Sequence, residues 1–437
     1  MLPAAPLSGK FANSFAYATI KDRLPVILTK VIDTVHRKRH EIISKHGESA
    51  DADVKAVISN LSELRYRMVT DKQVEKFDTD LSDQDMWSSA FEVQLKQSGG
   101  DPSKLTWFQA PWLFVECFMY RKIMLAFEKS VYLKEYDPFI YMKEQALLGF
   151  LELIERLGEF LVDTLGKLGK NEITDENKRI LFKEFLQLAL WGNKCDLSIS
   201  AGQQHTLDKE SVLQQTDALQ SNVIVNDIAR VTEVVFEEGS PGKAVVIVLD
   251  NAGMELFSDL CLAEFLLAAG LTEQVVFHAK EMPWFVSDTT AADFAWTLEI
   301  LRSSKMEALN RLGHLWHARL EKSEFLLRAH HFWTTPCSYN HMREMAPKLH
   351  EQLAEASLLV FKGDLNYRKL VGDLNWPLDT AFDVALRGFS PAKLVALRTL
   401  KADLCVGLRD RALATAASQS GTDWMTSGDS AVIQANF

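Results

Sequence analysis

The sequence has few cysteines and no long basic run, and each of these absences excludes a class of protein. Five cysteines stand far apart among 437 residues and form no C-x-x-C pair. This spacing argues against a disulfide framework and a thiolate zinc site, and it indicates reduced thiols in the cytosol or nucleus. No basic cluster exceeds HRKRH at 36–40, and the formal net charge is −11. We therefore expect no direct nucleic-acid partner and no docking on an anionic membrane.

Membrane and secretory signals are also missing from the sequence. No stretch approaches 18 uninterrupted apolar residues, so we expect no membrane-spanning helix. The first 21 residues lack a basic head followed by an apolar core, so we expect no secretory signal. These features predict a cytoplasmic protein and leave a nuclear location open. The length favours two domains, and a content of 47% hydrophobic and 24% charged residues is typical of globular proteins.

The first part of the chain has the apolar period of helices. Residues 19–47 place apolar side chains on one side of a helix that Gly47 ends. Residues 106–130 are apolar nearly all round, which predicts a buried helix. Further amphipathic helices are predicted at 139–168, 177–191 and 314–331.

After about residue 240, short β-rich runs alternate with helical patterns. These runs are AVVIVL (244–249), VVFHA (275–279) and LLVFKG (358–363). Such alternation predicts a mostly parallel sheet covered on both faces. We therefore predict an α/β protein with a helical N-terminal domain (1–200), a loop and connector (201–240) and a C-terminal α/β/α sandwich (241–437). About the last 25 residues, rich in small and polar types, are expected to form a poorly ordered tail.

Oxygen-bearing side chains stand where the first predicted strand ends. Asp250 and Asn251 follow the run at 244–249, and Gly253 lets the backbone turn sharply. Open parallel sheets bind ligands beyond the carboxyl ends of their strands. A carboxylate and a carboxamide there suit a hard cation such as Mg²⁺ or Mn²⁺. The alternative, which spacing alone favours, is a turn with a helix N-cap.

The later strand exits carry related groups. Asp288 follows the second run and is either part of a helix cap or a third oxygen ligand. The third run leads into GDLNYRK at 363–369, whose carboxylate, amide and basic groups suit a phosphate beside a cation, or a solvated loop. RTLK at 398–401 adds an arginine and a lysine, which taken alone would be surface residues.

Several familiar site patterns are missing. An aspartyl-phosphate enzyme of the haloacid dehalogenase type needs a second Asp two positions after the first, and Ala252 stands there. Neither a G-x-G-x-x-G loop nor a G-x-x-x-x-G-K-[ST] loop follows the strand. His314 and His317 form an H-x-x-H without a carboxylate motif, and the surrounding pattern favours a helix surface over a metal site.

Two further places in the helical part carry polar groups. Glu116 lies within the apolar run of the buried helix, and a buried carboxylate must find a partner or lose its charge. Tyr120 and Arg121 are the candidate partners. Asn193 and Asp196, in WGNKCDLS, close the helical part, and a helix end followed by a turn explains them without a function.

In this order, WGNKCDLS, VLDNAGMEL, PWFVSDTT, FKGDLNYRK and RTLK resemble the metal-dependent damage-control phosphatases. The resemblance is strongest to the subgroup that ends in an Arg-Thr-x-Lys motif, whose animal members are also described as protein-glutamate O-methyltransferases. It runs almost end to end, without the extreme termini and the 201–240 loop. It implies a helical domain packed on an α/β/α domain, which agrees with the fold predicted from the residues.

The resemblance also implies roles for individual residues. The positions that match the family's metal ligands are Asp250, Asn251 and Asp288. Those that match its substrate contacts are Asp250, Asn251, Asp364, Leu365, Asn366, Tyr367, Arg368 and Lys401. Glu255 and Asp288 match positions assigned to S-adenosylmethionine, and Asn193 and Asp196 match a shared motif near the site.

The activity that the resemblance implies is hydrolysis of small sugar phosphates, fructose 1-phosphate and fructose 6-phosphate among them, as disposal of reactive metabolites. The expected cofactor is Mn²⁺, Ni²⁺, Co²⁺ or Mg²⁺. The catalytic residues in this hypothesis are Asp250, Asp364 and Lys401, with Asp364 orienting or deprotonating water and Lys401 and Arg368 neutralising phosphate charge.

Two other functions stay open. One is methyl transfer from S-adenosylmethionine to glutamates of a protein, with a link to the DNA replication clamp and the damage response. LDNAGMEL lacks the glycine-rich turn that common methyltransferases place after their first strand. The other is a non-catalytic scaffold, and the intact candidate ligands argue against it.

Overall fold

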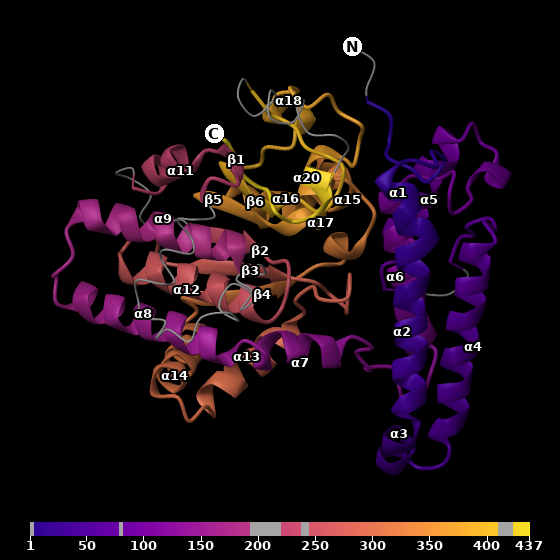
Figure 1. Ribbon diagram of the computed structural model, residues 1–437, viewed down its shortest axis with the longest axis horizontal. Coiled ribbons are helices and arrows are strands. Elements are labelled where there is room, and N and C mark those ends of the chain that lie inside the picture. The colour runs from indigo at the N-terminus through magenta and orange to yellow at the C-terminus, as the bar shows by residue number, and fades with distance from the viewer. Residues whose placement is uncertain (1–3, 78–81, 193–219, 237–243, 410–422) are drawn as a thin grey trace.

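The computed structural model describes residues 4–77, 82–192, 220–236, 244–409 and 423–437 (Figure 1). Up to Trp191 the described chain is helical. Its elements are α1 (Phe15–Ala18), a π-helical turn (Thr19–Arg23), α2 (Leu24–Arg37), α3 (Arg39–His46), α4 (Ala50–Val69), α5 (Gln84–Gln97), the 3₁₀ turn η2 (Pro102–Lys104), α6 (Trp112–Glu128), α7 (Ile140–Leu148), α8 (Leu151–Gly169) and α9 (Asp175–Trp191).

The helices predicted before residue 200 are present, with breaks that periodicity did not show. The helix predicted over 19–47 is divided into the π-helical turn, α2 and α3, and Gly47, at φ 89°, ends it as predicted. The predicted helix 139–168 is divided between Leu148 and Leu151. Helix α6 is buried on nearly every side, as its apolar sequence predicted. No helix of the described residues is long and apolar enough to cross a membrane.

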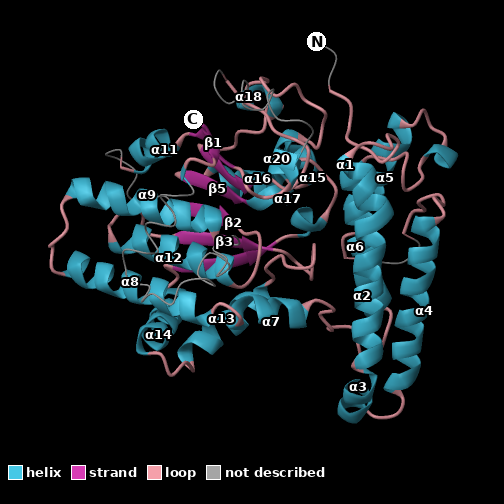
Figure 2. Ribbon diagram, viewed as in Figure 1, coloured by secondary structure: helices cyan, strands magenta, loops and turns pink. Residues whose placement is uncertain are grey.

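The described residues beyond α9 form one seven-stranded sheet with helices between the strands (Figure 2). The strands are β1 (Val223–Asn226), β2 (Val245–Val248), β3 (Val275–Ala279), β4 (Phe325–Ala329), β5 (Leu358–Lys362), β6 (Leu394–Thr399) and β7 (Ala431–Asn436). The helices are α11 (Ile228–Val235), α12 (Met254–Ala268), α13 (Ala291–Arg302), α14 (Glu307–Glu321), α15 (Met342–Met345), α16 (Pro347–Ala354), α17 (Gly363–Val371), α18 (Phe382–Ala385) and α20 (Asp423–Thr426).

The sheet order is β1-β7-β6-β5-β2-β3-β4, and β2 to β6 run parallel. The chain moves outward from β2 through β3 to β4, then returns to the other side of β2 with β5. The strand order therefore reverses between β2 and β5. In open α/β sheets this is where a crevice forms beyond the strand ends.

Alternate side chains of the central strands enter two different cores. Val245 and Ile247 pack with α8, α9 and α12, while Val246 and Val248 pack with α16, α17 and the segments around them. All four residues of β2 are buried. The C-terminal part is thus an α/β/α sandwich, as the sequence predicted. The helical part has a third core around α2, α4 and α6 (Figure 1).

Three sequence predictions outside the central strands were wrong. Within the expected loop and connector 201–240, the described residues 220–236 form β1 and α11 instead. The helix predicted over 314–331 ends with α14, and its last part is β4. The expected tail contains β7, which pairs antiparallel with β6 and parallel with β1.

Candidate functional site

Asp250 and Asn251 stand directly beyond the carboxyl end of β2. Both are buried, with 8% of each residue exposed. The N-cap of α12 is Gly253, at φ 80°, and no side chain caps this helix. The cap alternative is therefore wrong for Asp250 and Asn251, because neither residue occupies the capping position.

The carboxamide of Asn251 is fixed by its neighbours. Its Nδ2 donates to Oδ2 of Asp250 and to Oε2 of Glu255, each at 2.8 Å. Its Oδ1 accepts a hydrogen bond from the hydroxyl of Ser287 at 2.5 Å. Because two carboxylates take up the N–H groups, the oxygen side faces the loop after β3, and oxygen is the atom that a hard cation would bind.

The loop between β3 and α13 brings Asp288 to Asn251. The two residues form an isolated antiparallel bridge, and the N–H of Thr289 donates to the carbonyl oxygen of Asp250 at 2.7 Å. Thr290, not Asp288, is the N-cap of α13 and takes part in a capping box. The carboxylate of Asp288 therefore does not cap the helix.

This loop is held in a strained conformation. Phe285 and Val286 have φ values of 44° and 72°, a left-handed conformation that costs of order 1–3 kcal/mol for a residue other than glycine. The ring of Phe285 stacks on Tyr120 of α6, with 4.6 Å between the centroids. A helix of the N-terminal part thus packs against the loop that carries Ser287 and Asp288.

The exit of β5 meets Asp250 directly. Gly363 has φ 82°, and a Cβ atom there would lie 1.9 Å from Oδ2 of Asp250, so only glycine fits. The carboxylate of the next residue, Asp364, accepts from Nε of Arg398 at 2.8 Å and from the N–H of Lys401 at 3.1 Å. Residues that follow β2, β3, β5 and β6 therefore meet at the point where the strand order reverses.

The next side chains of α17 are occupied inside the protein. Nδ2 of Asn366 donates to the carbonyl oxygen of Lys362 at 2.7 Å, and the hydroxyl of Tyr367 donates to Oε1 of Gln434 at 2.6 Å. Leu365 belongs to the core of the N-terminal helices. The substrate contacts predicted here are therefore expected from backbone N–H groups in the first turn of α17, which lack partners within the helix.

Arg368 is held by two carboxylates. Its Nε and Nη2 donate to Asp373 at 2.7 and 3.0 Å, and its Nη1 donates to Oε2 of Glu116 at 2.8 Å. Glu116 is buried and paired, the first of the two outcomes expected for it, but the candidate partners, Tyr120 and Arg121, were wrong. Sequence spacing suggested a local partner, whereas the fold supplies one 252 residues away. Contact between Arg368 and a phosphate stays a prediction, and the guanidinium would have to release one carboxylate.

Comparison with known proteins identifies the family of this chain. The damage-control phosphatase ARMT1-like domain matches residues 19–416. A Danio rerio relative named damage-control phosphatase ARMT1 is 41% identical over 442 residues, which cover 99% of this chain and 97% of the relative. The Homo sapiens protein of that name is 41% identical over 446 residues, which cover 98% of each chain. The chain belongs to the ARMT1-like damage-control phosphatases.

Two buried lysines of this ARMT1-like chain support the site and were missed by the sequence reading. Nζ of Lys280 donates to the carbonyl oxygen of Leu249 at 2.9 Å and lies 3.3 Å from Oδ2 of Asp288. Nζ of Lys362 pairs with Glu255 at 3.0 Å and with Asp259 at 2.7 Å. Each lysine stands at or directly after the end of an apolar strand. A lysine at the end of a buried strand is the signal that could have predicted these ion pairs, because a buried lysine needs carboxylate partners.

Lys401 meets this buried group through its backbone N–H, which donates to Asp364 at 3.1 Å. Lys401 is exposed at the exit of β6. Asn193 and Asp196 lie outside the described residues. His314 is exposed on α14, as the helix-surface interpretation predicted.

The candidate site brings several carboxylates close together. Burial, together with the charges of Glu255 and Asp288, raises the pKa of Asp250 well above its usual value. Burial raises the pKa of Asp288 to about 6, although Lys280 opposes the change. For Asp364, burial raises the pKa, but the charges of Arg398 and Arg368 outweigh it and the pKa falls below its usual value. Asp364 therefore stays ionised, which suits an orienting role better than proton abstraction.

The donor set fits a divalent cation. Oδ2 of Asp288 is buried and accepts no hydrogen bond from the described residues, although Lys280 lies nearby. A cation would bind this oxygen and offset the repulsion that Glu255 and Asp288 exert on Asp250. No three His, Cys, Asp or Glu side chains of the described chain form a ligand set, so Asn251 and water or substrate would complete the coordination.

Proposed function

We propose that this protein is a metal-dependent phosphatase that hydrolyses small sugar phosphates, fructose 1-phosphate and fructose 6-phosphate among them. Asp250, Asn251 and Asp288 would hold the cation, which is Mn²⁺, Ni²⁺, Co²⁺ or Mg²⁺. The observation that carries the proposal is the meeting of Asp250, Asn251 and Asp288 beside the start of α17, at the switch point of the sheet. The names of the relatives support the reaction class.

Each protein group has a task that follows from its position. The backbone N–H groups that begin α17 would bind phosphate oxygens, and exposed Lys401 would neutralise their charge. The Asp364 carboxylate, held by Arg398, would orient the attacking water. When bound, the cation polarises the phosphoryl group and lowers the pKa of water.

Asp250→Asn tests the proposal because it removes a ligand charge and keeps the side-chain shape. We expect phosphate release to fall by about a hundredfold or more. The melting temperature should stay equal or rise, because a carboxylate crowded by Glu255 and Asp288 loses an unfavourable charge. Release would be measured with fructose 1-phosphate and fructose 6-phosphate, with EDTA and with each of the four metals.

Glu264→Gln is the matched control for a buried carboxylate. Glu264 pairs with Arg319 at 2.7 Å, on residues that are not part of the candidate site. This variant should lose thermal stability and keep its activity, the reverse of Asp250→Asn. Full metal-dependent turnover in Asp250→Asn would contradict the proposed cation site.

Methyl transfer to protein glutamates stays the alternative. Glu255, which matches a predicted S-adenosylmethionine contact, already pairs with Lys362 and accepts from Asn251. The strand before it leads to a single glycine, Gly253, rather than to a glycine-rich turn. If no metal restores phosphate release, transfer of label from S-adenosylmethionine to the replication clamp becomes the next measurement.

A further inference from the structure

The atom that Asn251 offers to a cation depends on how its side-chain amide is turned. One end of a carboxamide is an oxygen, which binds cations, and the other is an NH₂ group, which only donates hydrogen bonds. The two ends have nearly the same shape, so packing alone does not choose between them. Asn251 is buried, and its hydrogen-bond partners therefore decide which end faces the loop that carries Asp288.

The carboxylates beside Asn251 fix this choice. The hydroxyl of Ser287 lies 2.5 Å from Oδ1, but a hydroxyl donates or accepts and would serve either orientation. The carboxylates of Asp250 and Glu255 only accept, and each lies 2.8 Å from Nδ2. A reversed amide would place its oxygen beside both carboxylates. The orientation that presents the oxygen to the loop is therefore strongly favoured.

Lys362 holds the carboxylate of Glu255 in this position. Its Nζ lies 3.0 Å from Oε1 of Glu255, while Oε2 of the same carboxylate accepts from Asn251. Nζ also lies 2.7 Å from Oδ1 of Asp259, which stands one turn after Glu255 on α12. The side chains of Lys362, Glu255 and Asp259 are at most 5% exposed. These contacts are therefore shielded from water, and each oxygen of Glu255 has its own donor.

We propose that Lys362 and Glu255 are positioning residues for the cation. Lys362 orients the Glu255 carboxylate, and that carboxylate orients the Asn251 amide so that its oxygen faces Ser287 and the cation site. Partners behind a metal ligand commonly fix its orientation in this way. The inference rests on the proposed cation site. A purely structural role, in which the ion pairs only tie α12 to β5, predicts different effects of substitution.

Two substitutions of Glu255 separate orientation from charge, because both remove the same negative charge. In Glu255→Gln the oxygen of the new amide turns to Lys362, which has only donors, so the new NH₂ group meets the NH₂ group of Asn251. The Asn251 amide is then driven to turn its nitrogen toward the cation site. In Glu255→Met no opposing donor is present, and Asp250 still accepts from Asn251.

We expect Glu255→Met to weaken binding of Mn²⁺ by about tenfold and Glu255→Gln by about a hundredfold. The melting temperatures should have the opposite order, because the glutamine keeps a hydrogen bond to Lys362 and the methionine does not. A purely structural role predicts that Glu255→Gln, which is closer in shape, binds Mn²⁺ better. Mn²⁺ alone is the probe, and its electron paramagnetic resonance signal measures the free ion, with thermal unfolding followed in parallel.

A double variant tests the part of Lys362. With Lys362→Met added to Glu255→Gln, the new amide turns its oxygen toward Asn251, and Mn²⁺ binding should recover to that of Glu255→Met. A structural role predicts a further loss instead, because more contacts of α12 are removed. This comparison stands even if Glu255→Gln alone fails to fold. Binding about tenfold weaker in the double variant than in Glu255→Met would overturn the proposal.

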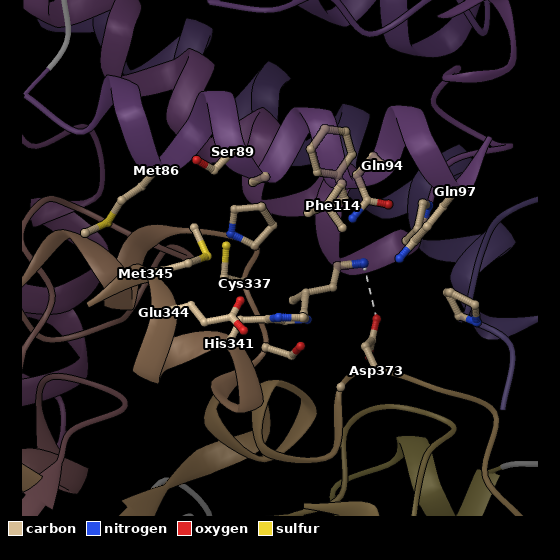
Figure 3. Close-up of a pocket in the computed structure, with 18 of the residues that line it drawn as sticks. Met86, Ser89, Gln94, Gln97, Phe114, Cys337, His341, Glu344, Met345 and Asp373 are labelled. Carbon is tan, nitrogen blue, oxygen red and sulfur yellow. Dashed lines mark hydrogen bonds between the residues drawn. The ribbon is translucent and has the colours of Figure 1, made fainter. Parts of the chain in front are cut away.

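Two controls show that the effect belongs to this site. Glu264→Gln makes the same change on α12, at a carboxylate that pairs with Arg319. The second control concerns a separate cavity of about 470 Å³ between α5 and the segment that includes α15, where Asp85 and Glu344 also offer carboxylates (Figure 3). Neither Glu264→Gln nor Glu344→Gln should change the affinity for Mn²⁺.

The outcomes separate this inference from the proposed function. Equal Mn²⁺ affinity of Glu255→Gln and Glu255→Met would leave the cation site in place and overturn the positioning role. Absence of Mn²⁺ binding by the unmodified protein, or unchanged binding by Asp250→Asn, would overturn the proposed cation site and this inference with it.

Discussion

At the scale of single residues, the ion pair between Glu116 and Arg368 joins the helical part to α17. Both side chains are about 3% exposed, and Arg368 also stacks on Trp112, with 3.7 Å between the guanidinium carbon and the ring centroid. Glu116→Gln should lower the free energy of unfolding by about 1–3 kcal/mol, because it weakens a charge-assisted bond while Asp373 still holds the arginine. Chemical denaturation measures this change. Glu63→Gln, at an exposed position of α4, should have almost no effect, and equal stability of the two variants would contradict the importance of the pair.

Single residues also show what the sequence could predict of the site. Asp250 and Asn251 were predicted as site residues because acceptor side chains directly after an apolar run indicate a strand end, and Asp288 was predicted from the loop that follows the next run. Lys280 and Lys362 were missed, since a lysine at the end of such a run looks like a surface residue until its carboxylate partners are known. The order of the strands decides which distant residues become ion-pair partners. Periodicity along the sequence does not reveal that order.

At the scale of elements, the junction of β5 and α17 sets the position of Asp250. Gly363→Ala would place a methyl group on the Asp250 carboxylate, 1.9 Å from Oδ2, and would strain a left-handed backbone by about 1–2 kcal/mol. We expect a loss of phosphatase activity of at least about tenfold, because the displaced carboxylate no longer meets Asn251. Gly270→Ala is the matched control, since Gly270 has φ 72° and open space around its Cβ position. It should lose similar stability and keep its activity, and equal activity in both variants would argue against the role of this junction.

The elements also divide into those that local pattern can predict and those that it cannot. The central strands β2, β3 and β5 are fully buried, so they appear as continuous apolar runs. Strand β4 is buried at its start and exposed at its end. Its sequence continues the amphipathic pattern of α14, so the pattern predicted one helix in place of a helix and a strand. Strand β7 follows residues rich in serine, threonine and glycine. Its sequence AVIQAN pairs with β6, a partner that the local pattern does not indicate.

At the scale of the whole molecule, β7 joins the edge strand β1 to the rest of the sheet, since it lies between β1 and β6. Deleting residues 431–437 should prevent stable folding. The strand buries Val432 and Ile433 completely, and their side chains alone contribute about 3–6 kcal/mol, which is comparable to the net stability of a domain. The deletion would also expose the edge of β6 to pairing with other chains. Deleting only Phe437, which is 40% exposed, should leave the melting temperature nearly unchanged. Soluble yield and thermal unfolding measure both, and a soluble, cooperatively unfolding product from the longer deletion would show that the sheet is complete without β7.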